Sequence, residues 1–79
     1  MFLKRIEVVY QNSARHFIVG TPMETIVSDV RIKPDPDKIV KTIELTDQLL
    51  KIEYGDKEVT WLPINKAIEL NFKEELESE

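Results

Sequence analysis

Residues 42–72 constrain the fold more than any other part of this chain, because apolar and polar residues alternate along them between short polar turns. Alternation with a period of two places successive side chains on opposite faces of a β-strand. Gly55-Asp56 has the composition of a two-residue hairpin turn, since glycine reaches positive φ without a Cβ clash. Asp47-Gln48 is a second candidate turn. The segment therefore predicts an antiparallel β-meander.

The two turns determine which residues lie opposite one another. The register set by each turn places the large apolar side chains on the same face. Because the two turns were placed independently, their agreement supports the register. The opposite face is polar and sets Glu44 against Lys51, but the same register also leaves Leu49 and Leu62 opposite each other there. The predicted apolar rows across the strands are Ile43/Ile52/Val59 and Leu45/Leu50/Trp61. Trp61 is therefore expected in the core.

Alternation also predicts strands in the first half of the chain. Residues 2–10 and 15–20 flank a polar cluster and predict a hairpin, and residues 24–33 predict a third strand. Residues 34–37 read Pro-Asp-Pro-Asp. Proline lacks the amide donor and restricts the residue before it, so this segment cannot continue a central strand. We expect a loop there, with the meander beginning at Ile39.

The residues after Pro63 fit two structures. Pro63 suits a first helical position, and the apolar residues that follow it share one helical stripe. Against this, residues 68–73 alternate strictly, which favours a strand. We favour a short helical turn at residues 63–66 followed by a strand. The alternative is a C-terminal helix from about Pro63, which would make the fold α+β.

Length and composition favour one small all-β domain over residues 1–73, followed by a frayed acidic tail at 74–79. A chain of 79 residues buries only about 60% of its unfolded surface. The chain contains no cysteine, so disulfides and thiolate metal sites are excluded, and self-association is one remaining way to stabilise a small core. No signal peptide or membrane span is recognisable, so we expect a soluble, cytoplasmic protein.

Residues 61–68, Trp-Leu-Pro-Ile-Asn-Lys-Ala-Ile, resemble the end of an SH3-like barrel. In that family a strand runs through a hydrophobic-Pro-x-Asn turn into a short helical turn and a closing strand. The resemblance implies a small barrel. It does not imply a groove for proline-rich peptides, because the chain lacks the acidic and aromatic opening motif of SH3 domains.

The sequence contains no recognisable catalytic or metal-binding motif. His16 is the only histidine, and no nucleophile elbow, phosphate-binding loop or zinc spacing occurs. Asp35 and Asp37 supply only two carboxylates to their loop, without the glycine-centred calcium motif. The predicted register sets Glu53 opposite Glu58, but a carboxylate pair at an exposed hairpin tip is ordinarily repulsive rather than catalytic. We therefore predict a protein that is not an enzyme and has no cofactor.

Charge indicates the class of partner. Fifteen acidic and eleven basic residues give a net charge of −4, which argues against general nucleic-acid binding. In general character the chain resembles small acidic phage-encoded proteins that occupy host DNA-binding proteins or polymerases during host takeover. We predict an inhibitor or regulator that mimics nucleic-acid charge towards a basic partner protein. The predicted contact residues are Asp35, Asp37, Glu53, Asp56 and Glu58.

Other interpretations fit the same residues. A small barrel could bind nucleic acid through Lys4, Arg5 and Arg15 with nearby aromatic side chains. A structural subunit could self-assemble, as a homodimer or a larger ring, through exposed strand edges and the patch of Leu49 and Leu62. The acidic residues could also serve only to keep a small β-protein soluble and to protect its edges.

Overall fold

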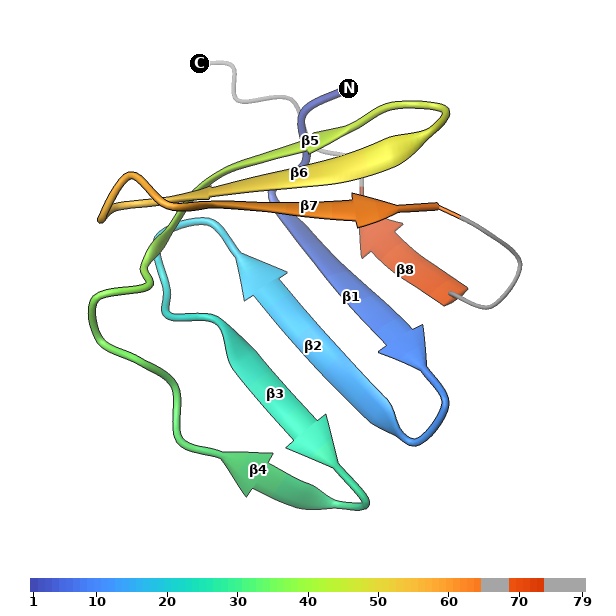
Figure 1. The fold of residues 1–79 in the computed structure, drawn as a ribbon, viewed down its shortest axis with the longest axis vertical. Coiled ribbons are helices and arrows are strands. Elements are labelled where there is room, and N and C mark those ends of the chain that lie inside the picture. Colours follow the sequence, from blue (N-terminus) through green and yellow to red (C-terminus); the bar gives the residue numbers. More distant parts are fainter. Residues whose placement is uncertain (65–68, 74–79) are drawn as a thin grey trace.

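The computed structural model describes residues 1–64 and 69–73, and its regular structure there is entirely β (Figure 1). One antiparallel sheet has the strand order β4-β3-β2-β1-β8, and a second has the order β5-β6-β7. The strands are β1 (Arg5–Tyr10), β2 (Ser13–Ile18), β3 (Glu24–Val27), β4 (Val30–Ile32), β5 (Val40–Leu45), β6 (Leu49–Tyr54), β7 (Val59–Pro63) and β8 (Glu69–Lys73). The predicted all-β class is confirmed.

The C-terminal helix considered as an alternative is not present, because Glu69–Lys73 form strand β8, which pairs with β1. The predicted helical turn at residues 63–66 is not seen in its first part, since Pro63 is the last residue of β7. Its remaining part, residues 65 and 66, and the acidic tail at 74–79 lie outside the described residues.

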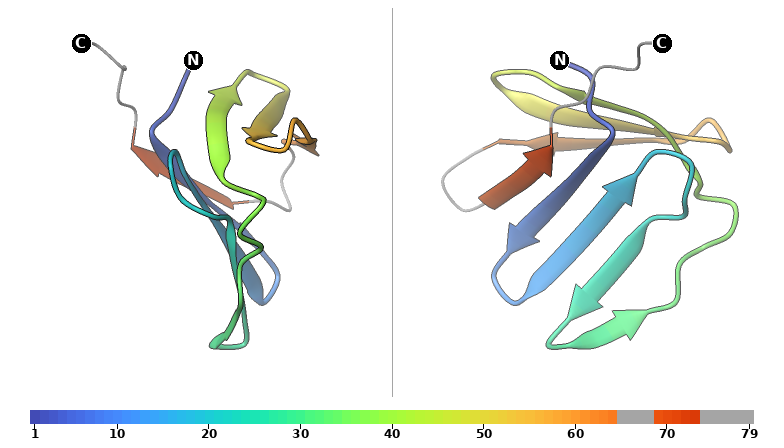
Figure 2. Two further views of the ribbon diagram at one scale, coloured as in Figure 1. Left: turned by 90° about the vertical axis from the view of Figure 1, so that its left-hand side faces the viewer. Right: turned by 180° about the vertical axis from the view of Figure 1, so that it is seen from behind.

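The two sheets face each other and enclose the hydrophobic core between them (Figure 2). The buried side chains come from both layers: Leu3, Ile6, Val8, Phe17, Val40, Ile43, Leu50, Ile52 and Tyr54. Strand alternation accounts for this set, because Ile6 and Val8 face inward from β1 and the register places Phe17 opposite Ile6. Burying one large apolar side chain contributes roughly 1.5–3 kcal/mol.

Strand β5 joins the two sheets through main-chain hydrogen bonds at both of its ends. Near its end, the amide of Leu3 donates to Ile43 O at 3.0 Å, which brings the N-terminal residues alongside β5. At its start, the amide of Gly20 donates to Val40 O at 2.9 Å, and the amide of Val40 donates to Thr21 O at 2.9 Å. The two layers are therefore fixed to each other by hydrogen bonds as well as by apolar packing.

The β5–β6 hairpin has the predicted register. Leu45 lies opposite Leu50, Ile43 opposite Ile52, and Glu44 opposite Lys51. Thr46 closes the turn, since its hydroxyl oxygen accepts the amide of Leu49 at 3.1 Å. A bulge between Val40 and Thr42 interrupts the alternation at the start of β5, where Val40 is buried.

The β6–β7 hairpin does not have the predicted register. The amide of Tyr54 donates to Glu58 O and the amide of Lys57 to Tyr54 O, both at 3.0 Å. The loop therefore covers residues 55–57 and is one residue longer than predicted. Its left-handed residue is Lys57, with φ of 73°, whereas Gly55 does not have a positive φ. The assumption that glycine must supply the left-handed position was wrong.

One added loop residue moves the whole of β7 to the opposite face. Leu62 lies opposite Leu50 and packs against the core, while Trp61 lies opposite Lys51 on the outer face. The predicted pairs of Leu50 with Trp61 and of Ile52 with Val59 are therefore wrong. The predicted outer pair of Leu49 and Leu62 is wrong as well, since Leu49 lies opposite Pro63.

The predicted third strand, residues 24–33, is in fact a hairpin of β3 and β4. Ser28 and Asp29 form its turn with φ of 49° and 68°. A two-residue turn with both φ values positive ordinarily uses asparagine or glycine, so the sequence did not indicate a turn there. The first predicted hairpin is confirmed by β1 and β2, and residues 34–37 form the expected loop.

Candidate functional site

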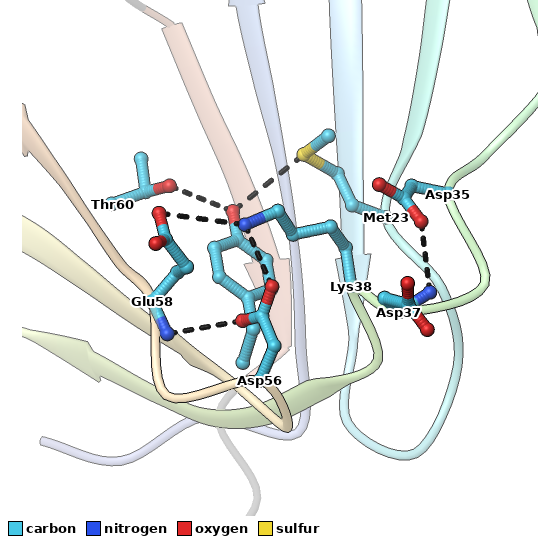
Figure 3. Close-up of polar contacts among 8 residues, drawn as sticks. Met23, Asp35, Asp37, Lys38, Asp56, Glu58 and Thr60 are labelled. Atoms are coloured by element: carbon cyan, nitrogen blue, oxygen red, sulfur yellow. Dashed lines mark hydrogen bonds and ion pairs between the residues drawn. The ribbon is translucent and has the colours of Figure 1, made fainter.

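The predicted acidic residues lie largely at one end of the molecule, around Lys38 (Figure 3). Lys38 Nζ is 2.9 Å from Asp56 Oδ2 and 3.6 Å from Glu58 Oε1. Asp35 and Asp37 lie in the loop that leads to Lys38, where the amide of Asp37 donates to Asp35 Oδ1 at 2.9 Å. We call Asp35, Asp37, Lys38, Asp56 and Glu58 the acidic end.

Glu53 does not belong to this group. It lies opposite Val59 on the outer face of the three-stranded sheet, where its Oε1 accepts the hydroxyl of Thr42 at 3.4 Å. The expected pairing of Glu53 with Glu58 is therefore not formed. Of the five predicted contact residues, Asp56 and Glu58 meet at Lys38, Asp35 and Asp37 lie in the loop that precedes Lys38, and Glu53 lies on another face.

The carboxylates of the acidic end are partly neutralised within the protein. Asp56 accepts hydrogen bonds from the side chain of Lys38 and from the amide of Glu58. Both bonds lower the pKa of the Asp56 carboxyl below its usual value. The same hydrogen bond to Asp56 raises the pKa of Lys38, against the opposing effect of desolvation. Lys38 also lies over the ring of Tyr54, with Nζ 5.3 Å from the ring centroid. Sequence reasoning did not single out Lys38.

Residues next to the acidic end also hold separate segments of the fold together. Tyr54 is 3% exposed, and its hydroxyl is 2.8 Å from the hydroxyl of Thr60 and 3.6 Å from the sulfur of Met23. The amide of Gly55 donates to Ile39 O at 2.8 Å. These contacts connect the β6–β7 loop to the segments before β3 and β5, so part of this polar cluster serves the fold.

The outer face of the three-stranded sheet carries the single tryptophan of the chain, and its ring is exposed. Phe2, Glu44, Lys51 and Trp61 form one row across the strands, because each is the register partner of the next. Trp61 is 56% exposed and Phe2 52%. Lys51 Nζ lies 5.3 Å from the centroid of the Trp61 ring. We call this row, together with Val59, the Trp61 surface.

Sequence reasoning missed the Trp61 surface because it placed Trp61 in the core. One signal could have revealed the error: the predicted register exposed Leu49 and Leu62 together on a polar face. A shift of one residue removes that anomaly by turning Leu62 inward, and it must turn Trp61 outward at the same time.

The Trp61 surface has the composition of a protein interface. Tryptophan, tyrosine and arginine dominate the residues that contribute most to binding between proteins. An exposed ring on a regular sheet is already ordered and loses little conformational entropy when a partner covers it. Glu44 and Lys51 carry opposite charges and lie between the two aromatic residues. The row therefore has no net positive charge that would attract a polyanion.

The outer face of the five-stranded sheet carries a polar cluster whose members pair with one another. His16 Nε2 is 2.8 Å from Glu7 Oε2, and the side-chain amide of Asn71 donates to Glu7 Oε1 at 3.3 Å. The basic residues considered for nucleic-acid binding are not brought together: Arg5 points to this outer face, whereas Arg15 is the register partner of inward-facing Val8. We find no continuous basic patch formed by these two arginines.

Among residues 1–64 and 69–73, no three histidine, aspartate or glutamate side chains are grouped so that they could hold a metal ion. The same part of the chain has no helix of the length and hydropathy needed to cross a membrane. Comparison with models of known protein families, with curated proteins and with solved structures found no match to this chain. The resemblance to SH3-like barrels rests on residues 61–68, half of which lie outside the described residues.

Proposed function

We propose that this protein is a non-catalytic binding module that inhibits or regulates a partner protein, which it contacts through the Trp61 surface. The observation that carries the proposal is the outward position of Trp61 on a regular sheet, 56% exposed and held beside Lys51. Covering such a ring removes a large apolar area from water, and truncating an interface tryptophan of this kind typically costs 2 kcal/mol or more.

The charges of the face support a protein partner over a nucleic acid. Glu44 and Glu53 both lie on this outer face with Lys51. Single-stranded nucleic acids bind aromatic platforms that lie in positively charged grooves. With two carboxylates against one lysine, this face would repel phosphates, while a protein partner can match each charge with one of its own.

A second candidate contact is the acidic end, in keeping with the predicted charge mimicry. The observation that favours it is that Asp56 and Glu58 meet at Lys38, which directly follows the loop of Asp35 and Asp37 (Figure 3). Lys38 offsets part of this charge, so Asp35 and Asp37 are the residues through which a basic partner protein would be recognised in this case.

Capture experiments distinguish the two surfaces. Tagged wild-type protein, Trp61→Ala, Asp35→Lys/Asp37→Lys and the control Ile18→Thr are each used to capture partners from a bacterial lysate, with and without nuclease treatment. Ile18 is the matched control because it is an exposed apolar residue on the other sheet. We expect Trp61→Ala alone to lose the partner, with affinity for the purified partner lowered at least about 30-fold.

Loss only in the double lysine variant would move the contact to the acidic end and support the charge mimic. Retention of the partner by both variants would contradict both surfaces. Capture that disappears on nuclease treatment would contradict a protein partner and favour nucleic-acid binding. Thermal unfolding of every variant, followed by circular dichroism, shows whether a loss of binding merely reflects a loss of folding.

A further inference from the structure

The inward-facing side of the five-stranded sheet carries apolar residues beyond the area that the second sheet covers. Tyr10, Ser13, Val27 and Val30 form one row across β1 to β4, because each is the register partner of the next. Ile32 belongs to the adjacent row on the same face, where Arg15 and Thr25 separate it from Val8. Val30 is 65% exposed and Ile32 50%, whereas Phe17 on the same face of β2 is fully buried.

The exposed part lies on the β3–β4 hairpin, which extends away from the three-stranded sheet (Figures 1 and 2). β4 is the edge of the five-stranded sheet. The hairpin has a two-residue turn with Val27 opposite Val30. In such a hairpin the residues that flank the turn exchange hydrogen bonds, so the N–H and C=O groups of Arg31 point outward, away from β3.

We propose that β4 pairs antiparallel with β4 of a second copy of this chain, with the two-fold axis at Arg31. The five-stranded sheets of the two copies would then form one continuous sheet across the dimer. Arg31 of each copy would exchange a pair of main-chain hydrogen bonds with Arg31 of the other. Val30 of each copy would lie opposite Ile32 of the other, so the exposed apolar side chains of the two strands would contact each other.

The charges at the two ends of β4 favour a second copy of the same chain as the occupant. Asp29 precedes the strand and Lys33 follows it. Antiparallel pairing about Arg31 sets Asp29 of each copy beside Lys33 of the other, twice in one dimer. The two arginine side chains would meet at the axis, but each is already paired, since Arg31 Nη1 is 3.6 Å from Glu24 Oε2.

The pairing is closed and weak. A two-fold contact uses the same surface on both copies, so it ends at a dimer and does not propagate. β4 has only three residues and Pro34 follows Lys33, which limits how far the edge can pair. Interfaces of this small size belong to the weak and transient class, and we expect association to be seen between about 10 μM and 1 mM protein.

Charge exchange between the two ends of β4 tests the proposal by sedimentation equilibrium. Asp29→Lys alone sets lysine against lysine, and Lys33→Asp alone sets aspartate against aspartate, so each is expected to weaken self-association at least about tenfold. A 1:1 mixture of the two variants restores both opposite-charge pairs, so the mixture is expected to associate as well as wild type. Trp61→Ala is the control and is expected to associate like wild type.

Wild-type protein that stays monomeric at 1 mM would overturn the proposal. Equal association of the two single variants and wild type would also overturn it, as would loss of association in Trp61→Ala only. Failure of the mixture to recover would overturn the antiparallel register. Val30→Thr/Ile32→Thr, which leaves all charges unchanged, is expected to lose association, and wild-type behaviour of this variant would contradict the contact. The Trp61 control also separates this proposal from the one that assigns Trp61 to a different partner.

Discussion

Phe17 and Ile32 lie on the same face of one sheet, yet Phe17 is fully buried and Ile32 is 50% exposed. Both positions carry a large apolar residue and both belong to regular strands. They differ in what lies above them, because the three-stranded sheet covers the start of β1 and the end of β2 and does not reach the β3–β4 hairpin (Figure 2). Alternation therefore predicts which face of a strand is apolar, while the arrangement of the second layer decides whether that face becomes core or surface.

The largest expected effect concerns the part of the five-stranded sheet that the three-stranded sheet covers. We call this part the covered half, and the β3–β4 hairpin the uncovered half. Phe17→Ala removes a fully buried ring and leaves a cavity, so we expect the free energy of unfolding to fall by about 3–5 kcal/mol. For a domain of this size that loss is comparable to the whole stability. Urea denaturation measures it. A loss of less than about 1 kcal/mol would contradict the burial of Phe17.

Tyr54, on the three-stranded sheet that covers this half, gives a second, smaller effect. Tyr54→Phe keeps the ring but removes the hydroxyl that lies 2.8 Å from Thr60, so we expect the free energy of unfolding to fall by about 1 kcal/mol. Tyr10→Phe is the control, because Tyr10 is exposed, and its effect is expected to stay within about 0.5 kcal/mol. Equal effects of the two variants would show that the Tyr54 hydroxyl is not bonded as described.

The uncovered half should respond in the opposite way. Val30→Thr/Ile32→Thr replaces exposed apolar side chains with β-branched polar ones, so the monomer should change in stability by no more than about 0.5 kcal/mol at low concentration. Self-association should nevertheless be lost. Thermal unfolding at low concentration measures the first effect, and sedimentation the second. A large loss of stability in the dilute monomer would mean that the hairpin is covered after all.

The acidic end supplies the smallest effect, and its sign follows from the pKa of Asp56. That pKa is lowered by Lys38, so the ion pair stabilises the folded state above the unfolded pKa of 3.8. The stabilisation is lost as the pH falls through the lower, folded-state pKa. We expect Asp56→Asn to be less stable than wild type at pH 7, and we expect the difference in stability to shrink as the pH falls below 3.8. A difference between the two that persists unchanged at low pH would contradict this.

Lys38 gives the corresponding result at high pH. Its pKa is raised above 10.5, so its contribution is complete below that value and is lost as the pH rises through the folded-state pKa.

The sequence predicted the strands better than the turns. Alternation placed Ile43, Leu50 and Ile52 correctly in the core, and the β5–β6 hairpin had the expected register. The errors lie at turns where residues other than glycine adopt positive φ, namely Ser28, Asp29 and Lys57. Such residues carry only a weak sequence signal, so one hairpin was interpreted as a single strand and another was shifted by one residue.

The candidate surfaces show the same limit. The acidic residues were recognised from composition, but only the fold brings Lys38 between Asp56 and Glu58. Trp61 was assigned to the core by a register that was one residue short. One residue more or less in a loop decides which face of the next strand an apolar side chain lies on. Composition alone therefore does not show whether that side chain is buried or exposed.

The most direct test of the contrast between the two halves is a concentration series of amide NMR spectra, from about 20 μM to about 1 mM. We expect the signals of residues 29–33 to shift with concentration and the Arg31 amide to become protected from exchange with water. Signals of the core residues Phe17 and Ile52, and of the Trp61 indole, should stay in place. Concentration-independent spectra over residues 29–33, with the Arg31 amide equally exposed throughout, would contradict the conclusion that the uncovered half is an interface.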